Sequence, residues 1–298
     1  MRVLRSRADV GVHVLPAPTE AQLARALPRA DGVVMVMEWP ALTAGLLELA
    51  PRLRVACRFG AGYDNLDIAA LTRRGIPLAT TGAANADAVA EHALYLMLAL
   101  AKRGPALERA VKAGAWPRSF GGIELRGRTC LVVGYGRIGR EIARRAAAFD
   151  MKVVIVDPPV PGAERLEDAL PQADFVVLAC ALNPNTQKLV GAAALARMKR
   201  SAFLVNVARG PIIDEEALVA ALQEQRIAGA GLDVLETEPP RRDHPLLARD
   251  DVVFSPHVAG FVEAAYDRMA VACAQAALAG LDGELTASTV VNPEVLRS

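Results

Sequence analysis

The feature that most constrains the fold is a glycine-rich turn directly after a run of apolar residues. The run Thr129–Val133 leads into a G-x-G-x-x-G spacing made by Gly134, Gly136 and Gly139. In such a turn the first glycine lets the chain leave a strand sharply, the second lets the backbone approach a pyrophosphate, and the third lets helix and strand pack closely. The helix that follows offers unpaired N–H groups to an anion. The pattern predicts a strand, a turn and a helix that bind a dinucleotide.

A carboxylate follows the turn close to the position that binds the ribose of a dinucleotide. The β-branched run Lys152–Val156 ends in Asp157, near the spacing of about 20 residues at which an acid accepts both ribose hydroxyls. An acid there would repel a 2′-phosphate, so we expect NAD rather than NADP as the cofactor. The competing interpretation is that Asp157 only begins the turn at Pro158.

Strands and helices alternate along the chain, which predicts βαβ units and parallel sheets. Before the glycine turn, strands are predicted at Val10–Leu15, Val33–Met37, Arg54–Cys57 and Ile76–Ala79. From the turn onward, the predicted strands are Thr129–Val133, Lys152–Val156, Phe175–Ala179, Ala202–Asn206, Ile227–Leu232 and Val252–Phe254. This second series is the number expected for a doubly wound dinucleotide-binding domain.

Two consecutive helices, Ala86–Leu100 and one ending at Lys112, have no strand between them and predict the crossover between two domains. A last helix, Glu263–Leu281, would let the C-terminus pack back on the first domain. We therefore expect a discontinuous substrate domain, 1–98 with 281–298, and a cofactor domain, 99–280. A chain of 298 residues is long enough to give each domain its own core.

Charge and hydropathy exclude several classes of function. The 34 Lys and Arg residues nearly balance the 33 Asp and Glu residues, so no basic surface favours nucleic acid. Charged residues interrupt the N-terminal segment where a signal peptide needs an apolar core, and the apolar stretch Ala93–Ala101 is too short to span a bilayer. We expect neither a membrane nor a nucleic-acid partner.

Four cysteines are scattered singly, without a C-x-x-C pair or a nearby histidine at ligand spacing. They are Cys57, Cys130, Cys180 and Cys273. We expect buried thiols in a reducing cytoplasm and no metal site.

Three polar residues follow late strands, at the edge where a doubly wound sheet binds its ligands. They are Arg209, Glu238 and His257. A guanidinium, a carboxylate and an imidazole are the groups that reduction of a 2-oxo acid requires. Arg209 would bind the substrate carboxylate and carbonyl oxygen, and His257 would protonate that oxygen. Glu238 beside His257 would favour the imidazolium and orient its ring.

Each of these residues also has an ordinary structural interpretation. Arg209 before Gly210 is suited to a salt bridge, Glu238 before two prolines to a solvated turn, and His257 after a proline to capping a backbone group. Their joint position after a nucleotide-binding turn favours the catalytic interpretation. His92, in the long apolar helix, has no local partner, and we interpret it as structural.

The motifs together closely resemble the D-isomer-specific 2-hydroxyacid dehydrogenase family. They are Gly60–Asp67, Val89–His92, Gly127–Thr129, Gly134–Gly139, Asn206–Gly210, Leu232–Val234, Glu238–Pro240 and Ser255–His257. They extend over nearly the whole chain in the order that the family shows. The resemblance implies a Rossmann NAD domain, a flavodoxin-like substrate domain and a homodimer joined through the cofactor domains. Relatives usually begin with a further strand and helix, so two alternatives stay open: either the first domain lacks that unit, or the chain naturally starts upstream of Met1.

The resemblance also implies roles for individual residues. Arg209, Glu238 and His257 would form the catalytic site, and main-chain groups of Ala61 and Gly62 would bind the substrate carboxylate. Cofactor contacts would come from the three glycines of the turn and from Arg137 and Ile138 at the pyrophosphate, Asp157 at the ribose, Asp233 at the nicotinamide amide, and Ala208.

The substrate is the least determined part of the prediction. Arg58, just before the glycine loop, resembles an arginine of phosphoglycerate dehydrogenases and would suit a distal anion. It could instead pair with a surface acid. We expect an oxidoreductase acting on 3-phosphoglycerate or, alternatively, a reductase of glyoxylate, hydroxypyruvate or another small 2-oxo acid. A module of a different class, which senses NAD(H) without catalysis in the manner of a corepressor, remains a further alternative.

Overall fold

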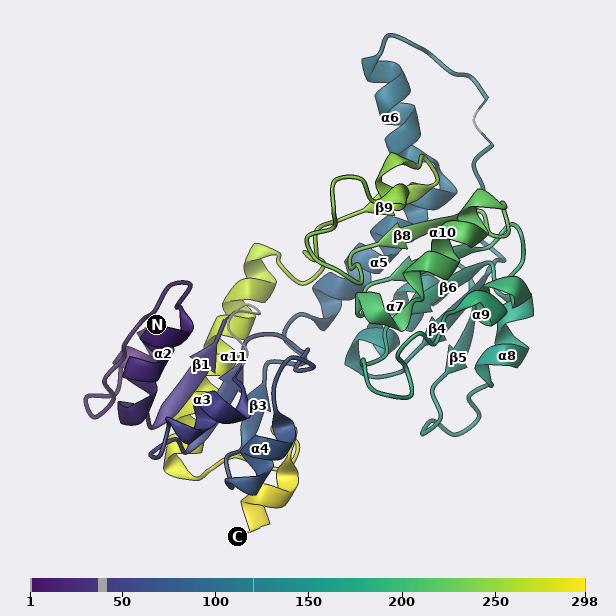
Figure 1. Cartoon of the computed structure of the whole chain (residues 1–298). Coiled ribbons are helices and arrows are strands. Elements are labelled where there is room, and N and C mark those ends of the chain that lie inside the picture. The colour runs from purple at the N-terminus through teal and green to yellow at the C-terminus, as the bar shows by residue number, and fades with distance from the viewer. Residues whose placement is uncertain (1, 37–41, 120, 298) are drawn as a thin grey trace. The chain divides into compact units, whose positions relative to one another are not determined.

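The chain folds into two units, each built on its own parallel sheet (Figure 1). The computed structural model describes residues 2–36, 42–119 and 121–297. The first unit comprises residues 1–85 and 263–298, and the second comprises 86–262. The α/β class with two parallel sheets is therefore confirmed, and each unit is described in turn.

The first unit contains, within the described residues, a three-stranded parallel sheet in the order β1-β2-β3. Its strands are β1 (Gly32–Met35), β2 (Val55–Arg58) and β3 (Leu78–Thr80). Its α-helices are α1 (Arg2–Arg5), α2 (Glu20–Ala26), α3 (Ala44–Glu48), α4 (Ile68–Arg73) and α11 (Glu263–Asp282). Two 3₁₀ helices, η1 (Leu27–Arg29) and η5 (Pro293–Arg297), complete it. The side chain of Thr19 caps the start of α2 in a capping box shared with Gln22.

Strand β2 shows how the first sheet is buried on both faces. Val55 and Cys57 point into a cluster with Met269 and Cys273 of α11, while Ala56 joins a cluster with Leu47 of α3 on the opposite face. Successive side chains of a strand point to opposite faces. A continuous apolar strand with helices on either side is the result.

The predicted strand Val10–Leu15 is wrong. No residue of this segment is in a strand or a bridge to one, and Val14 is 57% exposed. The alternation of apolar residues suits a strand, but a strand persists only when its N–H and C=O groups pair with a neighbour. Here the chain instead forms the short helix α1 before this segment, where Leu4 packs against the cluster of α11.

The second unit contains, over the residues described, a six-stranded parallel sheet in the order β5-β4-β6-β7-β8-β9. The strands are β4 (Thr129–Val133), β5 (Lys152–Val156), β6 (Phe175–Leu178), β7 (Phe203–Asn206), β8 (Gly229–Leu232) and β9 (Val252–Phe254). The predicted strands of this series are confirmed: three have the predicted ends, and the other three differ by one or two residues at one end. The strand order reverses beside β4, which makes the end of β4 the topological switch point where α/β sheets bind ligands.

Helices cover both faces of the second sheet, as a doubly wound fold requires. Over the residues described, the α-helices of this unit are α5 (Ala86–Ala101), α6 (Gly104–Lys112), α7 (Arg137–Ala148), α8 (Leu166–Ala169), α9 (Ala192–Arg197) and α10 (Glu215–Gln223), of which α6 packs on α5 and not on the sheet. Three 3₁₀ helices accompany them: η2 (Leu170–Gln172), η3 (Gly210–Ile212) and η4 (Pro245–Ala248). In β6, Val177 points to the face that packs against α5 and α7, and Val176 points to the face that packs against α9 and α10.

The boundaries of the two units differ from those expected for the two domains. The expected boundaries were 98/99 and 280/281, whereas the units divide after Asn85 and after Val262. The reason is the packing of the two long helices. Helix α5 packs on α7 and on strands β7, β8 and β9, whereas α11 packs on β1, β2 and β3.

No helix in the described part of the chain combines the length and the hydropathy that a bilayer crossing requires.

Candidate active site

The glycine turn lies at the switch point of the second sheet, between β4 and α7. Gly134 has a φ of +93°, and a Cβ there would lie 2.5 Å from the backbone N of Cys180. A Cβ on Gly139 would lie 1.9 Å from the carbonyl oxygen of Gly134. Both positions therefore require glycine so that the turn can pack against the segment after β6 and against α7.

Gly136 differs from the other two glycines. Its φ of −69° is open to any residue, and a Cβ there would meet nothing within 4 Å. The packing of the chain gives no reason for glycine at this position, so the missing side chain leaves room for a group from outside the chain. Together with the unpaired N–H groups of the first turn of α7, this geometry fits the pyrophosphate of a dinucleotide. Arg137 and Ile138 form the first turn of that helix.

Asp157 follows β5 directly, and its side chain is directed back to the glycine turn. Its Oδ2 accepts a hydrogen bond from the backbone N–H of Tyr135 at 2.7 Å. Its carbonyl oxygen accepts from the backbone N–H of Val160 at 2.9 Å. The backbone thus begins a turn, as the competing interpretation expected, while the carboxylate lies beside the glycine turn.

The segment after β7 holds Arg209 through an asparagine that is fully buried. Asn206 Oδ1 accepts from the backbone N–H of Ala208 at 3.0 Å, and its Nδ2 donates to the carbonyl oxygen of Arg209 at 2.9 Å. Arg209 is half-buried, and its Nη1 donates to the carbonyl oxygen of Ala208 at 2.7 Å. The sequence does not indicate this role of Asn206, because the residue forms the last position of an apolar strand.

Gly210 brings the Arg209 segment against the segment that carries Glu238. A Cβ on Gly210 would lie 1.9 Å from the carbonyl carbon and oxygen of Leu235. Only glycine allows this contact, in which two stretches of backbone touch. The close approach explains why a glycine follows Arg209, and it places Arg209 beside the loop after β8.

Glu238 and His257 form a hydrogen-bonded pair. His257 Nδ1 lies 2.8 Å from Glu238 Oε2, and both side chains are 31% exposed. The other oxygen, Oε1, accepts from the backbone N–H of Leu235 at 2.9 Å. Burial by itself raises the pKa of Glu238, but the hydrogen bonds from His257 and Leu235 and the charges of His257 and Arg209 outweigh it, so the pKa is lowered. The structure thus brings the three predicted catalytic residues together at one edge of the sheet.

Asp233, at the end of β8, holds the loop around His257. The carboxylate is 2% exposed. Its Oδ1 accepts from Ser255 Oγ at 2.6 Å and from the N–H of Val258 at 3.0 Å, and its Oδ2 accepts from the N–H of Ala259 at 3.0 Å. The structure therefore gives this carboxylate a role in the loop that the sequence analysis did not foresee.

His92 has hydrogen-bonding partners that the sequence analysis missed. Its Nε2 lies 2.6 Å from Ser255 Oγ and 3.6 Å from Asp233 Oδ1. The prediction of a structural histidine rested on the lack of a local partner, and the partner lies 163 residues further along the chain. The motif Val89–His92, which is part of the family resemblance, was the available signal.

The predicted substrate residues belong to the first unit and form a compact loop after β2. Arg58 is 6% exposed, and its Nε donates to the carbonyl oxygen of Gly62 at 3.2 Å. Thr81 Oγ1 accepts from the N–H of Gly60 at 2.8 Å, and the Thr81 N–H donates to the carbonyl oxygen of Gly60 at 3.2 Å. Ala61 and Gly62 are half-buried. The loop therefore has a defined shape, set by Arg58 and Thr81.

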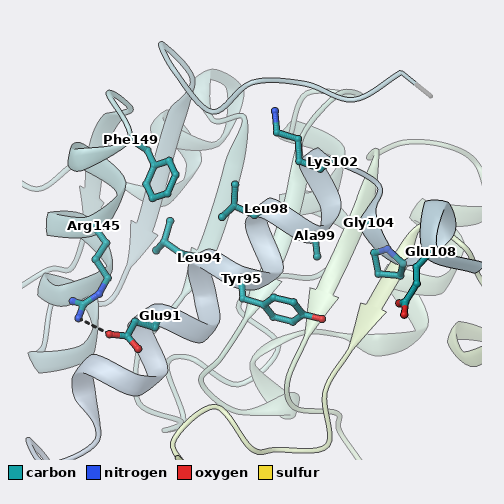
Figure 2. A pocket seen from close by; sticks show the side chains of 11 residues that line it. Glu91, Leu94, Tyr95, Leu98, Ala99, Lys102, Gly104, Glu108, Arg145 and Phe149 are labelled. Carbon is teal, nitrogen blue, oxygen red and sulfur yellow. Dashed lines mark hydrogen bonds and ion pairs between the residues drawn. The ribbon is translucent and has the colours of Figure 1, made fainter. Parts of the chain in front are cut away.

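A separate groove of about 750 Å³ lies on α5, α6 and α7 (Figure 2). Leu94, Tyr95 and Leu98 of α5 and Phe149 line it, and Arg145 closes one end in an ion pair with Glu91 at 3.4 Å. Among the described residues, its lining includes none of the predicted catalytic or cofactor residues.

Comparison with known proteins identifies the family of this arrangement. The model of the family described as "D-isomer specific 2-hydroxyacid dehydrogenase, NAD binding domain" matches residues 94–259, more than half of the chain. The chain belongs to the D-isomer-specific 2-hydroxyacid dehydrogenase family. Residues 94–259 lie in the second unit, so this unit is the NAD-binding domain of the family. The predicted family and the predicted cofactor, NAD, are both confirmed.

The relatives of this chain carry the names of different enzymes. The chain is 38% identical to a D-3-phosphoglycerate dehydrogenase of Methanocaldococcus jannaschii over 96% of its own length, and it spans 57% of that protein. It is 35% identical to a glyoxylate reductase of Thermofilum pendens, with coverage of 100% of this chain and 92% of the relative. Its fold matches a crystal structure of D-lactate dehydrogenase from Aquifex aeolicus, complexed with NAD and lactic acid, with a TM-score of 0.83 and 27% identity over 90% and 89% of the two chains.

Proposed function

We propose that the chain interconverts a small D-2-hydroxy acid and its 2-oxo acid with NAD as the redox partner, and that glyoxylate or a similarly small 2-oxo acid is the substrate reduced. The observation that carries this proposal is the hydrogen bond of 2.8 Å between Glu238 and His257. This hydrogen bond holds His257 in place as a proton donor at the carboxyl edge of the NAD-binding sheet, beside the guanidinium of Arg209.

The chemistry of the three residues follows from their charges. Arg209 binds the substrate carboxylate and the carbonyl oxygen, and so polarises the carbonyl carbon. His257 gives a proton to the carbonyl oxygen, which becomes the hydroxyl of the product, and takes that proton back in the opposite direction. Glu238 keeps the ring of His257 oriented and stabilises its protonated form. NAD, when bound, supplies or accepts the hydride.

The cofactor contacts that we propose involve one end of the second sheet. The backbone of Gly134–Gly139, with Arg137 and Ile138, would hold the pyrophosphate, and Asp157 would accept the ribose hydroxyls. Ala208 would line the cofactor site. Asp233 would act there less directly, because Ser255, Val258 and Ala259 already hydrogen-bond both oxygens of its carboxylate.

The choice of a small acid rests on Arg58. The arginine that would bind a distal phosphate is 6% exposed and donates to Gly62, a residue of its own loop. We propose that Arg58 shapes the loop whose main-chain groups at Ala61 and Gly62 bind the substrate carboxylate. A second candidate, 3-phosphoglycerate, is favoured by the relative from Methanocaldococcus jannaschii named for it.

A panel of substrates tests this proposal. Glyoxylate and hydroxypyruvate with NADH, and glycolate, glycerate, lactate and 3-phosphoglycerate with NAD, are compared by kcat/KM. We expect glyoxylate or hydroxypyruvate to be the best substrate. A preference for 3-phosphoglycerate that Arg58→Met removes, while the other acids are unaffected, would instead assign a phosphate to Arg58. Tight NADH binding without turnover of any acid would contradict the proposal that the chain is an enzyme.

We also propose a homodimer formed through the NAD-binding unit. Tyr95, which lines the groove on α5, is exposed, and so are Val111 of α6 and Trp116 just after it. Exposed apolar patches mark interaction sites, which supports the proposal. Light scattering coupled to gel filtration measures the mass directly, and a monomer at micromolar concentration would contradict the proposal.

The buried free thiols of Cys57, Cys130 and Cys273 support a reducing compartment such as the cytoplasm.

A further inference from the structure

A chain of hydrogen bonds connects α5 to the loop that carries His257. Ser255 Oγ has a single proton, and at 2.6 Å from Asp233 Oδ1 it donates that proton to the carboxylate, which can only accept. The same Oγ lies 2.6 Å from His92 Nε2 and must accept there. The hydroxyl geometry therefore requires that Nε2 of His92 carries a proton.

The last link of this chain consists of backbone groups on both sides of His257. The carboxylate of Asp233 accepts from the N–H groups of Val258 and Ala259. The carbonyl oxygen of Asp233 accepts from the N–H of His257 itself, at 2.7 Å. A single residue at the end of β8 thus fixes the backbone at His257 and at the two positions that follow.

The backbone of His257 needs this support. Its φ is +55°, in the left-handed region that side chains other than glycine rarely adopt. A residue in such a conformation costs on the order of 1–3 kcal/mol and stays there only when its surroundings enforce it. This conformation directs the imidazole to Glu238. The ring is hydrogen-bonded to the carboxylate of Glu238, while the main-chain N–H of His257 is hydrogen-bonded to the carbonyl oxygen of Asp233.

We propose that His92 is a positioning residue for His257, acting through Ser255 and Asp233. His92 donates to Ser255, which orients the Ser255 hydroxyl toward Asp233 and so keeps the carboxylate directed at the loop 255–259. This inference rests on the proposed function, since it gives His257 the role of proton donor. It adds a residue of α5, outside the catalytic edge, to the groups that determine the rate.

The protonation of His92 agrees with a donor of this kind. The side chain is 18% exposed. Burial lowers its pKa, and the nearby charge of Asp233, which raises it, does not compensate. A neutral ring with its proton on Nε2 donates a hydrogen bond to Ser255. The charged carboxylate of Asp233 then accepts from the backbone N–H groups of Val258 and Ala259. Contact of the ring with Tyr95, at 5.4 Å between centroids, packs His92 on its own helix.

Substitutions of His92 separate positioning from simple packing. His92→Leu keeps the bulk and removes the donor, while His92→Gln offers an amide N–H in its place. We expect His92→Leu to lower kcat by about 10- to 100-fold, the cost of misplacing a catalytic group by a fraction of an ångström to one ångström. KM for the 2-oxo acid and the affinity for NADH should stay within about twofold. His92→Gln should restore most of kcat. His13→Leu, at an exposed histidine of the first unit, is the matched control and should match the wild type.

A double-mutant cycle tests the route through Ser255. If His92 acts through Ser255, then Ser255→Ala lowers kcat as well, and the double variant is no slower than the slower single variant. Independent losses that multiply in the double variant would overturn the proposal. Unchanged kcat in His92→Leu would overturn it too.

Amide hydrogen exchange at Val258 and Ala259 provides a readout that needs no turnover. We expect exchange at these two amides to be at least about tenfold faster in His92→Leu than in wild type, with the β4 amides unchanged. If the wild type proves inactive on every acid, the proposed function fails, and the exchange rates still decide whether His92 holds the loop. If the wild type is active and exchange at Val258 and Ala259 is unchanged in His92→Leu, the positioning role alone fails.

Discussion

The carboxylate of Glu238 lies 2.8 Å from Nδ1 of His257. Two loops that follow different strands, β8 and β9, meet in this pair. The hydrogen bond at Nδ1 fixes the orientation of the imidazole ring of His257. In the proposed function, this pair makes His257 a general acid with a fixed orientation.

Replacing the carboxylate with an amide tests the charge in this pair. Glu238→Gln can still accept a hydrogen bond from His257 but no longer stabilises its protonated form. We expect kcat/KM for 2-oxo acid reduction to fall by about 10²-fold, with the loss greatest at alkaline pH, where the protonated ring is scarcest. Because the pKa of Glu238 is lowered below its usual 4.5, the wild-type pair persists as the pH falls to that value and is lost only below it. A pH profile of kcat/KM checks both statements, and a uniform loss at every pH would show that the charge of Glu238 is not what matters.

The stability of the protein should depend on pH through His92. Its pKa is lowered in the folded state from the usual 6.5, so the unfolded chain binds more protons in the interval below 6.5. The free energy of unfolding therefore falls as the pH falls through that interval. His92→Gln lacks this contribution, and we expect a smaller loss between about pH 8 and about pH 5.5 in urea unfolding. Parallel losses in the two proteins would show that His92 titrates normally.

The two glycines at the start of α7 should respond differently to alanine. A Cβ on Gly136 meets nothing within 4 Å, so Gly136→Ala should change the free energy of unfolding by no more than about 0.5 kcal/mol while weakening NADH binding. A Cβ on Gly139 would lie 1.9 Å from the carbonyl oxygen of Gly134, so Gly139→Ala should cost about 1–3 kcal/mol. Unfolding without cofactor and NADH fluorescence titration measure the two effects. Undiminished NADH affinity in Gly136→Ala would show that the cofactor does not bind at this turn.

The charge of Asp157 should decide between the two nicotinamide cofactors. Asp157→Asn keeps an oxygen that can accept from the N–H of Tyr135, a bond of 2.7 Å in the wild type, and removes the negative charge that repels a 2′-phosphate. We expect the preference for NADH over NADPH, as a ratio of kcat/KM, to shrink by about tenfold or more. An unchanged ratio would mean that the carboxylate serves only the turn.

Much of the second unit could be predicted from the sequence. Its strands are continuous apolar runs because both faces of the sheet are covered, and the polar residues that follow them stand out for the same reason. Arg209, Glu238 and His257 were predicted in this way, and the structure brings them together. Their roles remain predictions for the experiments above.

Other features depended on contacts that no local pattern records. The segment Val10–Leu15 alternates like a strand, but whether a neighbour pairs with it is a property of the folded sheet. The helices α5 and α11 are apolar over most of their length, which predicts burial without indicating the sheet that buries them, so the expected domain boundaries lie 13 and 18 residues from those observed, 98 against 85 and 280 against 262. The partner of His92 lies 163 residues away.

The most direct test of the account is the rate of NADH oxidation with glyoxylate in the wild type and in His257→Ala, followed by loss of NADH absorbance. We expect turnover in the wild type and a loss of at least about 10²-fold in kcat in the variant, with NADH binding retained because the glycine turn is intact. Equal rates in the two proteins, or NADH binding without turnover in the wild type, would contradict the assignment of His257 as the proton donor of a 2-hydroxyacid dehydrogenase.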